Sequence, residues 1–136
     1  MPVRRATGRT RMGSMIAAAA ACAMAFFAAT AVAFGADAAR GQQLWESRCF
    51  GCHALDADRV GPRHRGVVGR KAGTVPGFAY SPAVQRSGIE WTTAMLDAWL
   101  ADPQGLVPGQ RMNVRVAASE DRADIIAFLA RESAKR

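Results

Sequence analysis

Downstream of residue 37, apolar residues recur at helical spacing near both ends of the chain. In residues 38–49, Leu44 and Trp45 fall on one face, and Gly41 leaves room for the close approach of another helix. A last helix is expected to start at Ser119, because acidic residues follow it where the helix dipole favours them. The apolar face of this last helix consists of Ile125, Ile126, Phe128 and Leu129.

The middle of the chain predicts one further helix and a long loop. Thr92 or Thr93 is expected to cap a helix that Pro103 stops, and its apolar residues repeat at helical spacing. Residues 59–82 are rich in glycine and proline, which indicates a loop. No run of alternating apolar and polar residues is long enough to predict a sheet, so we expect an all-α fold.

The first thirty-odd residues have the layout of a secretory signal. A basic head of four arginines and no acidic residue precedes an uncharged run from Met12 to Gly35, and Ala31-Val32-Ala33 supplies small residues at the cleavage spacing. We therefore predict a cleaved signal peptide over residues 1–33, with the boundary uncertain by a few residues, and a folded domain over 37–136. An uncleaved membrane anchor, a twin-arginine signal and lipidation at Cys22 remain alternatives.

Removal of this leader changes the charge of the chain. The whole chain has 18 Lys and Arg against 11 Asp and Glu; without the four leader arginines, 14 basic and 11 acidic residues remain, a net charge of +3. These charges are interspersed and form no basic run, so a nucleic-acid partner is not expected. Export implies the periplasm, an oxidising compartment where two cysteines would ordinarily form a disulfide.

Two cysteines and a histidine lie within five residues in the stretch RCFGCH, as Cys49, Cys52 and His53. A thioredoxin-type pair needs a βαβ context, and no strand pattern precedes this one. A structural zinc needs four ligands, but the chain has one other histidine, His64, so zinc lacks ligands. A local disulfide leaves His53 unexplained. Covalent haem uses all three residues, because the thiols add to haem vinyl groups and the adjacent histidine can bind the iron.

A histidine-bound haem iron has a sixth position to fill. The mature chain offers two methionines and His64. Met95 falls within the helical repeat before Pro103, which favours core packing. Met112 follows a Pro-Gly pair in an extended loop that could carry its side chain across to a haem, and we predict it as the sixth ligand. His64 follows His53 closely, so a surface or haem-packing role is favoured for it.

Five segments cover nearly all of the mature chain: GQQLWESRCFGCH, VGPRHRGVVGRKAGTVPGFAYSPAV, GIEWTTAMLDAWLADP, VPGQRM and EDRADIIAFL. Within them, GRKAG-x-x-PGFAYS with the later GI-x-W is more specific than C-x-x-C-H. In this order the segments resemble a class I cytochrome c of the mitochondrial and bacterial c2 type.

The resemblance implies an all-α class I cytochrome c fold, with helices wrapped around one covalently attached haem c. Gly41 and Trp45 would cross the last helix near Phe128. Cys49 and Cys52 would be the thioether attachment points, His53 and Met112 the axial iron ligands, and Pro62 the carbonyl that orients His53. Three further residues match positions around the haem propionates: Arg70, Tyr80 and Trp91. Their guanidinium, phenol and indole N–H are donors that buried propionates need.

The chain also departs from the family pattern near the expected haem. His64 and Arg65 stand where the family usually has leucine and then histidine, which puts a polar side chain near the proximal wall. Trp99 replaces a tyrosine whose hydroxyl commonly contacts the ligand methionine. Val84 replaces an asparagine, and Val114 an aromatic residue. Hydrogen bonds and burial around a haem set its potential, so the potential cannot be carried over from relatives.

With both axial positions filled by protein, the expected function is one-electron transfer rather than catalysis. We expect a soluble, periplasmic and monomeric carrier that meets other redox proteins transiently, steered toward acidic surfaces by Arg48 and Arg111. Stable membrane insertion is not expected after signal cleavage. The alternative is a haem enzyme or small-ligand sensor in which Met112 is a labile ligand. A haem-free interaction module would require Cys49 and Cys52 to form a disulfide.

Overall fold

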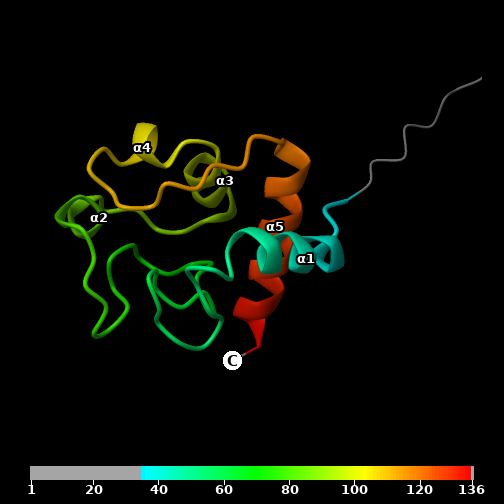
Figure 1. The fold of residues 1–136 in the computed structure, drawn as a ribbon, viewed down its shortest axis with the longest axis horizontal. Helices are drawn as coiled ribbons and strands as arrows, with labels where there is room; N and C mark the ends of the chain where they lie inside the picture. Colours follow the sequence, from blue (N-terminus) through cyan, green and yellow to red (C-terminus); the bar gives the residue numbers. More distant parts are fainter. Residues whose placement is uncertain (1–34, 136) are drawn as a thin grey trace, which may run out of the picture. The chain divides into compact units, whose positions relative to one another are not determined.

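The computed structural model describes residues 35–135 of the chain. The predicted leader, residues 1–33, lies outside the described residues. Within them the fold is all-α, as predicted, and its helices are α1 (Ala38–Arg48), α2 (Pro82–Arg86), α3 (Thr93–Ala101), α4 (Pro103–Leu106) and α5 (Ser119–Ala134) (Figure 1). The described part holds no strand, only an isolated bridge between Lys71 and Glu90. None of its helices is both long and apolar enough to cross a membrane.

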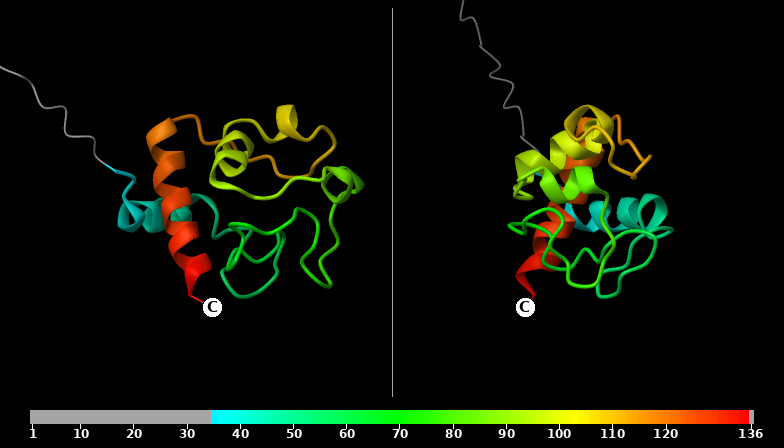
Figure 2. Two further views of the ribbon diagram at one scale, coloured as in Figure 1. Left: turned by 180° about the vertical axis from the view of Figure 1, so that it is seen from behind. Right: turned by 90° about the vertical axis from the view of Figure 1, so that its left-hand side faces the viewer.

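Helices α1 and α5 cross each other, and this crossing is the centre of the fold (Figures 1 and 2). A Cβ atom at Gly41 would overlap the backbone carbonyl of Asp124, so only glycine permits this approach. One turn further along α1, Trp45 packs on Phe128 with ring centroids 5.6 Å apart. Both side chains are almost fully buried, at 4% and 2% exposure. Gly41 and Trp45 therefore contact α5 near Phe128, as the family resemblance implies.

Charged side chains surround the crossing. Arg40 on α1 pairs with both Asp121 and Asp124 on α5, and Arg48 at the end of α1 donates to Asp121 at 2.8 Å. The Asp124 carboxylate also accepts from the backbone N–H of Asp37, directly before α1. The acidic residues early in α5 thus bind the basic side chains of α1, which fixes the register of the two helices.

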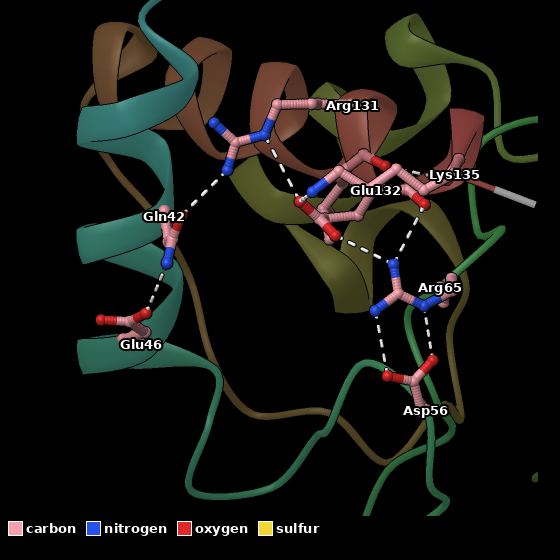
Figure 3. A network of polar contacts seen from close by, with 9 residues as sticks. Gln42, Glu46, Asp56, Arg65, Arg131, Glu132 and Lys135 are labelled. Carbon is pink, nitrogen blue, oxygen red and sulfur yellow. Dashed lines mark hydrogen bonds and ion pairs between the residues drawn. The ribbon is translucent and has the colours of Figure 1, made fainter.

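A second ion network joins the loop after α1 to the end of α5 (Figure 3). The Glu132 carboxylate, 4% exposed, pairs with Arg65 at 2.9 Å, Arg131 at 3.3 Å and Lys135 at 2.7 Å. Arg65 also pairs with Asp56 at the start of the loop. Because Arg65 reaches both the loop and α5, it holds the long segment 54–66 against the C-terminal helix.

Helix α5 begins at Ser119, as predicted; Ala118 precedes it, and no side chain caps the helix. The structure differs from the prediction at two short helices. Pro103 ends α3 as predicted but also begins the short helix α4. Thr92 caps α3 by accepting a hydrogen bond from the Met95 N–H at 3.1 Å, as predicted. The short helix α2, capped by Ser81, falls just after the predicted loop.

Replacing Gly41 with alanine should destabilise the protein although alanine is the better helix former by about 1 kcal/mol. The added Cβ has no space beside Asp124, and overpacking of this kind costs about 1–3 kcal/mol or more. Urea unfolding of the purified protein measures the change. Gly35→Ala is the matched control, because nothing lies within 4 Å of a Cβ built there. Equal stabilities of G41A and G35A would contradict the packing argument.

Replacing Glu132 with a neutral residue should make the stability of the protein depend less steeply on pH in the acid range. Hydrogen bonds from Lys135 and Arg65 hold the pKa of Glu132 below its ordinary value of 4.5, although burial opposes this. A lowered folded pKa contributes stability that is present above the unfolded pKa and is lost as pH falls through the folded one. Melting temperatures from pH 7 to pH 3 should fall less steeply for Glu132→Gln than for the parent, whereas Glu46→Gln, at an exposed position on α1, should follow the parent. Parallel curves for E132Q and the parent would contradict this.

Candidate functional site

The candidate site is a cavity of about 470 Å³ between the loop that follows α1 and the segments carrying α2, α3 and residues 110–114. Its lining is mostly apolar, from residues such as Val67, Leu96, Leu100 and Leu129. Every predicted site residue lines this one cavity: Cys49, Cys52, His53, Arg70, Tyr80, Trp91 and Met112. Residues more than 60 positions apart in sequence therefore meet around a single apolar space.

Cys49 and Cys52 follow α1 directly and are positioned by its last turn. The backbone N–H of Cys49 donates to Trp45 O at 2.8 Å, and that of Cys52 donates to Cys49 O at 3.0 Å. The two thiols are free, and no disulfide joins them. Burial raises the pKa of the Cys49 thiol to about 11, so the thiol is protonated at neutral pH.

His53 is held on two sides by the loop after the cysteines. Its Nδ1 lies 2.7 Å from the carbonyl oxygen of Pro62, which can only accept, so Nδ1 carries the proton and Nε2 keeps a free lone pair. A Cβ at Gly61 would overlap the imidazole, so glycine is required where the loop passes the ring. Burial lowers the pKa of His53, which favours the neutral form that can bind a metal.

Met112 reaches the cavity from the extended segment after α4. Its backbone is held by Gln110, a residue that the sequence analysis did not identify. Gln110 is buried, its Nε2 donates to Met112 O at 2.7 Å, and its Oε1 accepts from the Met112 N–H. One amide side chain thus holds both backbone groups of Met112. Met95, the other methionine considered, packs against the hydrophobic core and does not line the cavity.

The three residues expected near the propionates all line the cavity, but they differ in burial and in hydrogen bonding. Arg70 is half-buried and donates to the carbonyls of Arg63 at 2.8 Å and Arg65 at 3.2 Å. Burial raises the pKa of Tyr80, which keeps its hydroxyl protonated. Trp91 is buried and packs edge-on against Trp99, with ring centroids 5.2 Å apart. Each of the three offers donors beside the cavity.

These residues fit a covalently bound haem. The donor set contains two thiols, a neutral imidazole with a free Nε2 and a thioether around one apolar cavity, which is the chemistry that haem c requires. Within residues 35–135, no group of three or more His, Cys, Asp or Glu side chains could hold a metal ion, so the zinc alternative finds no ligand cluster there.

Comparisons with known proteins agree with this arrangement. The family model for cytochrome c matches residues 38–131. Cytochrome c2 of Rhodomicrobium vannielii is 44% identical over 108 residues, covering 76% of this chain and 85% of that protein. Cytochrome c 2.1 of Caenorhabditis elegans is 38% identical over 102 residues, covering 73% of this chain and 92% of that protein. Among solved structures, cytochrome cH from Methylobacterium extorquens is 41% identical with a TM-score of 0.67, covering 70% of this chain and 98% of that one.

Replacing Gln110 with alanine should make local opening of the backbone at Met112 more frequent. Loss of a buried hydrogen bond costs about 1 kcal/mol, so amide hydrogen exchange at Met112 should accelerate roughly five- to tenfold. Gln104→Ala is the control, because Gln104 accepts from the Gly109 N–H at 3.1 Å and should affect exchange at Gly109 instead. Unchanged exchange at Met112 in Q110A would show that the amide does not hold this segment.

Proposed function

The chain belongs to the cytochrome c family, and on that premise we propose that it is a periplasmic one-electron carrier in which His53 and Met112 bind the iron of its haem. The family binds one haem c covalently, and Cys49 and Cys52 are its attachment points here. When bound, the haem supplies one-electron exchange between ferrous and ferric iron.

The observation that carries the proposal is that His53 and Met112 come from opposite parts of the chain and line the same apolar cavity as the cysteine pair. Pro62 keeps Nδ1 of His53 protonated, so Nε2 is the nitrogen available to the iron. Gln110 fixes the backbone that carries the Met112 thioether. If His53 and Met112 both hold the iron, no position would be left for a substrate, which supports electron transfer over catalysis.

Low polarity around the site and methionine ligation both raise a haem potential. The described chain contributes the low polarity through the apolar lining, and Arg70, Tyr80 and Trp91 would satisfy the propionates at the cavity wall. We therefore propose that these three residues bind the propionates while excluding water.

Partner docking is proposed at the exposed apolar residues that line the cavity. Val60 and Val114 line the cavity and are exposed at 81% and 36%. Of the two arginines expected to steer partners, Arg48 shares its charge with Asp121, whereas Arg111 donates only a long hydrogen bond to Ala79 O at 3.5 Å. Arg111 is thus the cation better able to attract an acidic partner surface there.

Removal of Met112 tests the ligand assignment. The ferric protein, exported from a host that attaches haem, should show the far-red absorbance band of methionine-to-iron ligation, and Met112→Ala should lose it. The potential should fall by on the order of a few tenths of a volt, within the range of about 0.8 V that axial ligands span. Met95→Ala is the matched control, because Met95 also packs against the core but does not line the cavity, and it should keep the band.

The parent spectrum separates the proposal from its alternative. If the far-red band is absent in the parent, Met112 is a labile ligand or no ligand, and the haem enzyme or small-ligand sensor becomes the better assignment. A band that persists in M112A would also contradict the assignment of Met112.

A further inference from the structure

Three aromatic side chains form a row that ends on the proposed iron ligand. Trp45 on α1 donates from its indole Nε1–H to Nδ1 of His64 at 2.8 Å. The imidazole of His64 in turn stacks on that of His53, with ring centroids 3.9 Å apart and planes 24° apart. Nothing in the family resemblance assigns a role to His64, where a leucine is usual.

The hydrogen bond from Trp45 determines the state of His64. An indole N–H can only donate, so Nδ1 of His64 carries no proton and the ring is the neutral imidazole with its proton on Nε2. The backbone of His64 is fixed as well: its N–H donates to Ala54 O at 2.9 Å, and Arg70 donates to the carbonyls of the residues on either side of it. The ring that contacts His53 is thus held through both its side chain and its backbone.

His53 needs this contact because its other restraints leave one motion free. The hydrogen bond to Pro62 O fixes the position of Nδ1, and Gly61 allows the loop to pass close to the ring. A single hydrogen bond at one ring atom still permits the imidazole plane to rock. A flat ring stacked on its face, 3.9 Å away, opposes that rocking.

We propose that His64, held by Trp45, is a positioning residue that sets the plane of the His53 imidazole. This inference rests on the proposed role of His53 as an iron ligand. Contacts in the second shell of a metal site orient the ligand and thereby tune the metal's electronic properties. The plane of His53, and with it the magnetic and redox properties of the bound iron, therefore depends on the residue at position 64.

The test compares two double variants that differ only in whether position 64 carries a ring. Both contain Trp45→Phe, so neither leaves the indole N–H without an acceptor. In W45F/H64L the stacked ring is absent, and in W45F/H64F a flat ring is kept. The readouts are the hyperfine-shifted proton signals of His53 in the ferric protein and the reduction potential, neither of which a purely structural role would move. Urea unfolding of each variant records stability separately.

The His53 signals of W45F/H64L should be displaced from those of the parent, and those of W45F/H64F should stay close to the parent. The potential should shift upward in both double variants, because each replaces a polar imidazole near the iron with an apolar side chain, so the difference in the His53 signals is what reports the plane of the ring. If the two double variants give the same His53 signals, the stacked ring does not set the plane and the inference is overturned, whatever their stabilities. If the parent itself shows no hyperfine-shifted His53 signals, the ligand assignment of His53 fails and this inference fails with it.

Discussion

The close crossing of α1 and α5 at Gly41 determines where the rest of the site lies. Because no Cβ separates α1 from the backbone of α5, the end of α1 is brought to the edge of the cavity with Cys49 directly after it. Trp45 packs on Phe128 and at the same time reaches His64. The packing of α1 on α5 thus positions Trp45, which in turn positions the His64 ring that stacks on His53, the proposed iron ligand.

Around that crossing, the loops depend on polar contacts rather than on a large core. Residues 54–81 contain no helix, and the Glu132 network and Arg70 hold this segment through side chains and carbonyls. A chain of about a hundred ordered residues with so long a loop has a small apolar core. Haem c provides the apolar surface that the cavity lining can pack against, which explains why the lining is apolar although the segments that form it are mostly loops.

The fold could be predicted from sequence wherever the signal was local. The helical periodicity around Trp45 and Phe128, the cap at Thr92 and the stop at Pro103 each depend on residues within one or two turns, and the structure has helices there. The short helix α2 was missed although Ser81-Pro82 is a cap followed by a proline at the first helical position.

The site was predicted less completely, because its supporting contacts join residues far apart in sequence. The composition of the cysteine and histidine cluster indicated the haem, and the resemblance indicated Pro62, but no local pattern points to the bond between Trp45 and His64 or to the hold of Gln110 on Met112. From sequence, His64 differs from the leucine that is usual in the family, but the sequence does not show what the histidine contacts. The structure shows what accompanies it: an indole on α1 whose N–H needs an acceptor at that position.

The two proposed ligands are therefore held in different ways. His53 has its proton fixed by Pro62 and one face covered by His64, all within a loop that the Glu132 network binds to α5. Met112 lies in an extended segment, where the side chain of Gln110 holds its backbone and its own side chain is only partly buried against the core. Local opening favours segments with few buried contacts, so any displacement of a ligand should begin on the methionine side. If His64 positions His53 as proposed, a change at position 64 would alter the haem potential without touching the hydrogen bonds that hold Met112.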